Sequence, residues 1–239
     1  MNGLVKSVFG VASLLMISCS SMEKFSQHNF DSDFYRLKTH GAKPSRVYAE
    51  VTEDSIIVYP VTSDGKNEFL NTSSSVGSRI SRIKSDNYLY GSRFTKNSLD
   101  VDLTSILFKS RHSMDDVPNQ FSADLNFAIY AGFRKDIYRI VTPVHPLHEG
   151  RSSVRQIGFD AGIFAGIGSS SVNPTVTNNK ISQTYDAMIF QKGFAGFISI
   201  NGMSVGLAVG FDNFLDKNRT FWIYNQKAYL GLIISVSGF

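Results

Sequence analysis

The sequence predicts an all-β protein whose larger, C-terminal part is a small antiparallel up-and-down membrane β-barrel of about eight strands. First, apolar residues alternate with small or polar residues over long runs between positions 97 and 239. A β-strand points successive side chains to opposite faces, so each run has one apolar face. Second, the other face carries mostly Gly, Ser, Ala, Asn and Asp. Lipid outside and a tight polar interior require this pattern in an outer-membrane barrel.

Residues 1–18 are predicted to form a secretory signal peptide. Lys6 carries the lone charge, and an almost unbroken apolar run at 8–17 follows it. A positive start, a short apolar core and a small residue before the cleavage point are typical of export signals. The run ends at Ser18 and Cys19, which resemble the lipobox of bacterial lipoproteins. The resemblance implies that Cys19 is acylated; the alternative is an ordinary signal peptide that happens to contain this cysteine.

The next two segments are predicted to lie outside the barrel. Residues 19–44 begin with a polar stretch that has no hydrophobic period, and we interpret them as a lipidated tether. Residues 45–96 are interpreted as a hairpin and loop region. Within it, β-branched and aromatic runs at 45–62 predict a hairpin around Glu53 and Asp54, and the Ser-, Asn- and Gly-rich stretch at 63–80 predicts a loop.

Residues 97–239 are predicted to form the barrel. A change of parity near Thr104 and Ser105 predicts a β-bulge, and Asn201-Gly202 predicts a tight hairpin turn because both residues tolerate positive φ. A barrel of eight strands needs two strands in addition to the six given below. We expect these two from the hairpin at 46–61 or from short runs near 88–94 and 136–142. The six strands are expected at about 98–109, 121–134, 154–168, 184–200, 203–214 and 221–238.

The apolar face of these strands is expected to contact lipid. A tilted strand needs roughly 9–11 residues to cross the hydrocarbon, and the predicted strands reach that length. Bilayer hydrocarbon offers no hydrogen bonds, so a spanning sheet must close on itself. Aromatic residues near strand ends on the apolar parity are expected to form an outward belt, namely Phe121, Phe133, Phe211, Trp222 and Tyr224.

Charged residues on the other face predict a polar network inside the barrel. Unpaired charge in a dry core costs several kcal/mol, so the inward carboxylates need partners, of which Arg134 is the best placed. The many small inward residues leave little volume, and we expect a filled interior without a wide pore. The predicted network consists of Asp100, Asp102, Asp124, Arg134, Asp160 and Asp212.

A soluble β-sandwich or a lipocalin-like barrel also alternates apolar and polar residues. In those folds the apolar face is the core and the Gly- and Asp-bearing face meets water. A glycine-rich solvent face is unusual, because such faces prefer Thr, Lys, Glu and Arg. The decisive observation is therefore which face of the sheet is enclosed.

The stretches SLDVDLTSILFK, DLNFAIYAGFR, VRQIGFDAGIFAGIG and MSVGLAVGFDNFLDKNRTFWIYNQKAYLGLIISVSGF resemble the uncharacterised small outer-membrane β-barrel proteins common in Bacteroidetes-type bacteria. The resemblance covers about residues 97–239. It implies the outer membrane of a Gram-negative bacterium, contact with membrane lipid and with the outer-membrane assembly machinery, and no catalytic residues. Barrels of this class often end in Phe, as this chain does at Phe239, although the alternation before it is one residue out of register.

Two clusters invite a reading as chemical sites. His145 and His148 have a spacing that can hold a metal, but a polar loop with two histidines explains them more simply. His112 and Ser113 suggest a hydrolase pair, but adjacent residues in an extended loop point apart. One cysteine excludes a Cys-based metal site. We therefore predict no catalytic residues, no metal site and no cofactor.

The sequence favours a non-enzymatic function. The formal net charge of +4 is small and dispersed, which gives no case for a nucleic-acid partner. We expect an outer-membrane (lipo)protein with a structural or accessory role. Its expected partners are membrane lipid and other envelope proteins. The alternatives are a barrel that binds or transports a small solute or lipid, a hydrolase or acyltransferase at the membrane rim, and a lipid-anchored soluble β domain.

Overall fold

The computed structural model describes residues 30–52, 55–64, 67–74, 76–79, 89–114, 117–141 and 153–236. The described residues are all-β and every strand pairing among them is antiparallel, as predicted. No helix in these ranges is long and apolar enough to cross a bilayer. The strands are β1 (Asp33–Lys38), β2 (Ser45–Val51), β3 (Ser55–Asp64), β4 (Asn67–Leu70), β5 (Val76–Arg79), β6 (Arg93–Arg111), β7 (Gln120–Ser122), β8 (Asn126–Val141), β9 (Ser153–Val172), β10 (Tyr185–Ile200), β11 (Met203–Phe214) and β12 (Ala228–Val236), with 3₁₀ turns at Thr72–Ser74 and Thr175–Thr177.

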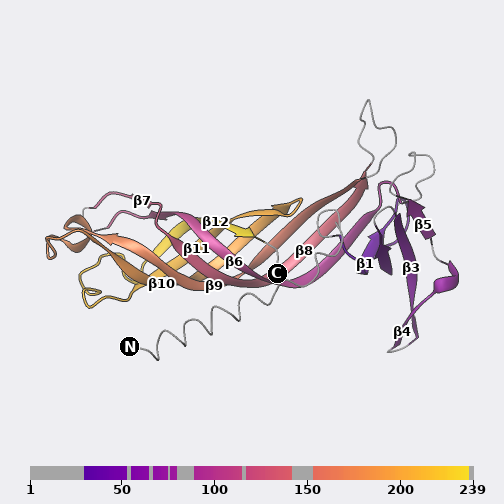
Figure 1. Cartoon of the computed structure of the whole chain (residues 1–239), viewed down its shortest axis with the longest axis horizontal. Helices are drawn as coiled ribbons and strands as arrows, with labels where there is room; N and C mark the ends of the chain where they lie inside the picture. Colours follow the sequence, from indigo (N-terminus) through magenta and orange to yellow (C-terminus); the bar gives the residue numbers. More distant parts are fainter. Residues whose placement is uncertain are drawn as a thin grey trace, which may run out of the picture.

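Six long strands are joined edge to edge in a closed ring (Figure 1). The order is β6, β8, β9, β10, β11, β12, and β12 pairs again with β6, from Tyr229 opposite Arg111 to Val236 opposite Leu103. The ring therefore has two strands fewer than the eight that we expected. The hairpin of β2 and β3 forms as predicted, but it lies outside the ring.

A smaller sheet continues from one end of the ring, where Figure 1 shows β1, β3, β4 and β5 gathered together. It starts at β6, which pairs with β1, and β2 and β3 follow. The tether prediction for residues 19–44 is therefore wrong at 33–38, and the loop prediction for 63–80 is wrong at 67–70 and 76–79. These strands are too short for alternation to identify them. β1 is held by the burial of Tyr35 and Leu37 in a shared core.

β6 belongs to both parts of the sheet. One of its edges pairs with β8 from Arg93 to Ser105. On its other edge, β1 covers residues 93–95 and β12 covers residues 103–111 apart from a bulge. Residues 96–102 lie between these two partners, so β1 and β12 diverge on that edge.

The predicted bulge is present, but it lies two to three residues later. Leu232 stands opposite Phe108 and Ile233 stands opposite Ile106, so Leu107 is the additional residue. Ile106 remains buried inside the ring. Beyond the bulge the parity is reversed, and Lys109 points inward. The hairpin turn at residues 201 and 202 forms as predicted, with φ values of 50° and 87°.

The apolar face of the ring strands points outward, and the face with glycines and carboxylates is enclosed. Met203 is 81% exposed and Phe133 is 77% exposed, whereas Asp212 is fully buried. Other exposed apolar side chains on the ring are Leu99, Val101, Leu103, Ile129, Ile157, Phe159, Ile163, Ile167, Met188, Phe194, Ile198, Val205, Leu207, Val209 and Leu230. A soluble sandwich requires the opposite arrangement.

The prediction of an outward belt is wrong for Trp222 and Tyr224. Both side chains are buried at one end of the ring, where Trp222 stacks on Phe214 at a centroid distance of 5.1 Å. The reason is that β12 begins only at Ala228, so no strand alternation applies to residues 221–227. Phe121, Phe133 and Phe211 are exposed as expected, although the strand predicted at 121–134 is divided into β7 and β8.

Close approach of neighbouring strands explains several inward glycines. At Gly162, Gly166, Gly193 and Gly206, a Cβ atom would collide with backbone atoms of the adjacent strand. Glycine permits such an approach because it has no side chain. Glycines at such positions let a twisted sheet bend far enough to close. The outward Gly196 has no such collision.

Candidate functional site

The interior of the ring contains two groups of buried charges. The first, here the Asp212 cluster, consists of Lys109 and Arg111 of β6, Asp212 of β11 and Asp124. Asp212 accepts hydrogen bonds from the ammonium of Lys109 at 2.8 Å and the guanidinium of Arg111 at 2.6 Å. Lys109 and Asp212 are fully buried. Since β12 lies between β6 and β11 in the ring, these ion pairs cross the interior.

Aromatic rings line the Asp212 cluster. The Lys109 ammonium lies 4.5 Å from the ring centroid of Tyr229, and the Arg111 guanidinium lies 5.5 Å from that of Trp222 and 5.4 Å from that of Tyr224. A cation over an aromatic face is attracted by the negative face of the ring. The inward position of Trp222 is thus explained by its contact with Arg111.

Asp124 supplies the second negative charge of the cluster. Its Oδ2 atom is buried and has no hydrogen-bond partner among the described residues. Its carboxylate lies within electrostatic range of the Lys109 ammonium. Two carboxylates therefore face two cations, and the cluster is balanced in formal charge.

The second group, here the Arg134 cluster, lies nearer the end of the ring that carries β1–β5. Arg134 of β8 donates to Asp100 of β6 at 3.1 Å and to Asp136 at 3.0 Å. Asp136 also accepts a hydrogen bond from the Gln156 amide at 2.6 Å. The guanidinium thus connects β6 and β8, and Asp136 extends the connection to Gln156 of β9.

Two more carboxylates of this cluster are held by hydroxyl groups. The Tyr130 hydroxyl donates to Asp160 at 2.5 Å, and the Ser235 hydroxyl donates to Asp102 at 2.5 Å. The second bond joins β12 to β6, the pair that closes the ring. Altogether four carboxylates, those of Asp100, Asp102, Asp136 and Asp160, surround Arg134 on the inner face.

Gln156 connects the Arg134 cluster to the hairpin turn between β10 and β11. Its side-chain carbonyl accepts a hydrogen bond from the backbone N–H of Gly202 at 3.1 Å. Its backbone N–H donates to the Asn201 side chain at 3.2 Å. The geometry of the turn is thereby fixed to the buried charges by hydrogen bonds.

Five of the six predicted network residues form hydrogen bonds or ion pairs on the inner face, and Asp124 lies within electrostatic range of Lys109. They do not form one network, because Asp124 and Asp212 belong to one group and the others to the second. Sequence reasoning missed Lys109, Arg111, Tyr130, Asp136 and Gln156. The two cations lie beyond the bulge, where the parity is reversed, whereas Tyr130 shares the parity of Arg134 on the same strand and could have been found by alternation.

The interior is filled by side chains. Tyr130, Lys109, Ile189, Ile233 and Gln191 are among the largest fully buried residues. Phe164 and Phe197 belong to the central apolar core, and Tyr130 packs edge-on against Phe197 at 4.9 Å. In the described residues, no group of three or more His, Cys, Asp or Glu side chains is placed to hold a metal ion.

The hydrolase candidates are not brought together. His112 and Ser113 are both exposed, and the backbone N–H of Ser113 donates to Asn119 at 2.8 Å. No hydrogen bond is found between these two side chains in the described part of the chain. The neighbouring Asp115 and Asp116, the pair His145 and His148, the lipidation candidate Cys19 with the predicted signal peptide, and Phe239 lie outside the described residues.

Comparison of the chain with protein-family models, with curated proteins and with solved structures finds no match.

Proposed function

We propose that this chain is a β-barrel (lipo)protein of the outer membrane of a Gram-negative bacterium, with a structural or accessory role in the envelope and no enzymatic activity. The six-stranded ring is the membrane barrel in this proposal. Its partners are membrane lipid, the assembly machinery that inserts it and other envelope proteins.

The observation that carries the proposal is the apolar outer surface of the ring. Large apolar side chains are exposed on each of its six strands, from Leu99 on β6 to Leu230 on β12. Soluble monomers rarely expose contiguous apolar patches larger than a few hundred Å². Burying one such side chain is worth roughly 1.5–3 kcal/mol, so a bilayer around the ring is strongly favoured over water.

The height of this surface supports the same proposal. On β11 the outward apolar residues run from Met203 to Phe211, which is eight residue steps. At ~3.3 Å per residue and a strand tilt of about 40°, they span about 20 Å along the barrel axis, close to the apolar band of roughly 25 Å in outer-membrane barrels.

The filled interior supports a structural role over transport. Six strands enclose less space than the eight of small bacterial barrels, and aromatic rings, ion pairs and close strand contacts at glycines occupy it. A narrow transporter requires a continuous path, whereas the central core of Tyr130, Phe164 and Phe197 lies across the middle of the ring.

Membrane fractionation followed by electrophoresis tests the proposal. We expect the protein to remain in the membrane pellet after an alkaline carbonate wash, and to migrate differently on a gel before and after boiling, because a closed sheet resists detergent until it is heated. The same result is expected for Cys19→Ser. A protein that leaves the membrane when this anchor is removed would be a tethered soluble domain, and ion conductance in a planar bilayer would favour transport.

A further inference from the structure

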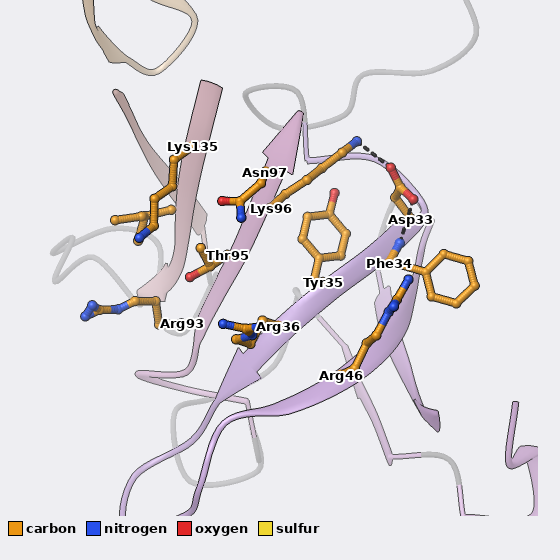
Figure 2. A pocket seen from close by; sticks show the side chains of 11 residues that line it. Asp33, Phe34, Tyr35, Arg36, Arg46, Arg93, Thr95, Lys96, Asn97 and Lys135 are labelled. Carbon is orange, nitrogen blue, oxygen red and sulfur yellow. Dashed lines mark hydrogen bonds and ion pairs between the residues drawn. The ribbon is translucent and has the colours of Figure 1, made fainter. Parts of the chain in front are cut away.

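A pocket of about 620 Å³ opens where β1 and β6 diverge, next to the ring (Figure 2). The last paired residues there are Arg36 of β1 and Thr95 of β6. Basic side chains from four strands surround the opening, whereas Asp33 is the single carboxylate among the described residues that line it. The basic residues are Arg36 of β1, Arg46 of β2, Arg93 and Lys96 of β6, and Lys135 of β8.

The Asp33 carboxylate already has an ion-pair partner and a hydrogen-bond donor. Asp33 forms an ion pair with Lys96 and accepts a hydrogen bond from the backbone N–H of Phe34 at 2.6 Å. Partial burial raises the pKa of Asp33, but these two donors lower that pKa by more, so the group remains ionised. Arg36, Arg93 and Lys135 make no ion pair within the described ranges. The pocket therefore has an excess of positive charge.

The strand register places like charges directly opposite one another on this face. Arg36 stands opposite Arg46, and Arg93 stands opposite both Lys38 and Arg139. Arg139 in turn stands opposite Arg155. Directly opposed like charges destabilise a sheet. A bound anion would relieve this repulsion.

The pocket also lies at the boundary of the apolar outer surface. On β8, Lys135 precedes the pocket-lining Ile137 and follows the exposed Phe133 by two residues on the same face. On β6, Asn97 lines the pocket and Leu99, the next outward residue, is exposed. Basic residues at such a boundary lie at the depth of lipid phosphates.

We propose that this pocket binds the phosphodiester headgroup of an anionic glycerophospholipid, with the acyl chains lying along the outer surface beside Leu99 and Phe133. Guanidinium groups are suited to it because their planar fork donates two parallel hydrogen bonds to a phosphate. The inference rests on the proposed membrane location. The lipid would hold the β1–β5 sheet against one bilayer surface.

Native mass spectrometry of the full-length protein in detergent tests this binding, with phosphatidylglycerol, phosphatidylcholine and inorganic phosphate added in separate arms. We expect preferential retention of phosphatidylglycerol. The double variant Arg36→Gln/Arg93→Gln should weaken the binding about twenty-fivefold, because each basic residue near a lipid surface contributes roughly fivefold. The charge-matched control Lys217→Gln/Arg219→Gln changes exposed residues at the other end of the ring and should retain the lipid.

Three outcomes would overturn the inference: equal retention of the two lipids, equal losses in both double variants, or complete displacement of the lipid by millimolar phosphate, which would indicate a free-anion site. Each variant is first checked for the gel shift on boiling. A protein that inserts into the membrane and shows the gel shift, but has no lipid preference, contradicts only the proposed lipid binding in this pocket. A protein that does not insert contradicts the proposed function.

Discussion

Leu207→Arg tests the outward apolar face most directly. Leu207 lies in the middle of β11, is 61% exposed, and stands opposite Gly196 of β10 and Leu232 of β12. It is four residues from Met203 and four from Phe211, the two ends of the apolar run on this strand. If that run spans the hydrocarbon, Leu207 lies near the bilayer midplane.

The expected cost follows from this depth. Arginine on the lipid face of a barrel costs roughly 2–4 kcal/mol at the midplane and about 0–1 kcal/mol near the interface. Met203→Arg introduces the same side chain at the end of the same strand and is the matched control. In water the two substitutions would be nearly equivalent, because surface changes usually alter stability by about 0.5 kcal/mol or less.

Urea unfolding in phospholipid vesicles measures both variants. Trp222 is the protein's one tryptophan, and its buried contact with Phe214 makes its fluorescence a reporter of folding. We expect the free energy of unfolding of Leu207→Arg to lie at least about 1 kcal/mol below that of Met203→Arg. Equal values for the two variants would refute the claim that this face contacts hydrocarbon.

Three further predictions use the same chain. Asp212→Asn leaves two buried cations without their main partner and should lower the free energy of unfolding by about 3–5 kcal/mol, whereas the exposed Asp186→Asn should change it by less than about 0.5 kcal/mol; similar losses would contradict the buried ion pairs. Gly193→Ala introduces a methyl group against the neighbouring backbone and should cost about 1–3 kcal/mol more than Gly196→Ala, where the nearest atom is 3.6 Å away; equal melting temperatures would contradict the close strand contact. Cys19→Ser should abolish incorporation of labelled palmitate, and a variant that still takes up the label is acylated elsewhere.

The long ring strands are the part of the fold that the sequence predicts well. β11 is found at the predicted residues 203–214, and β10 begins within one residue of its predicted start. Alternation succeeds there because it repeats over many residues. It fails for β1, β4 and β5, which have 4–6 residues. Their strand conformation depends on pairing and on tertiary packing.

The residues of the candidate network can be predicted only where inward and outward side chains alternate without interruption. Asp102 and Asp160 follow directly from alternation on β6 and β9. Lys109 and Arg111 lie beyond the bulge at Leu107, where one additional residue exchanges the two faces. Asp136 was missed because the predicted strand ended two residues before it. The pocket beside β1 was not predictable, because its residues come from strands paired through long-range contacts.

The positions of the buried polar pairs give a reason for their presence. Replacing a buried ion pair by apolar residues of the same volume often leaves stability unchanged or raises it, so stability alone does not explain these pairs. Several of the pairs join β6 to other strands: Asp102 bonds to β12 across the closure, and Lys109 and Arg111 reach β11, the strand beyond β12. A slip of one residue between β6 and β12 would turn these cations outward among Leu107 and Phe108. Closing a six-stranded ring in that register would place charged side chains among the exposed apolar residues of the outer face, and the buried pairs therefore favour the observed closure.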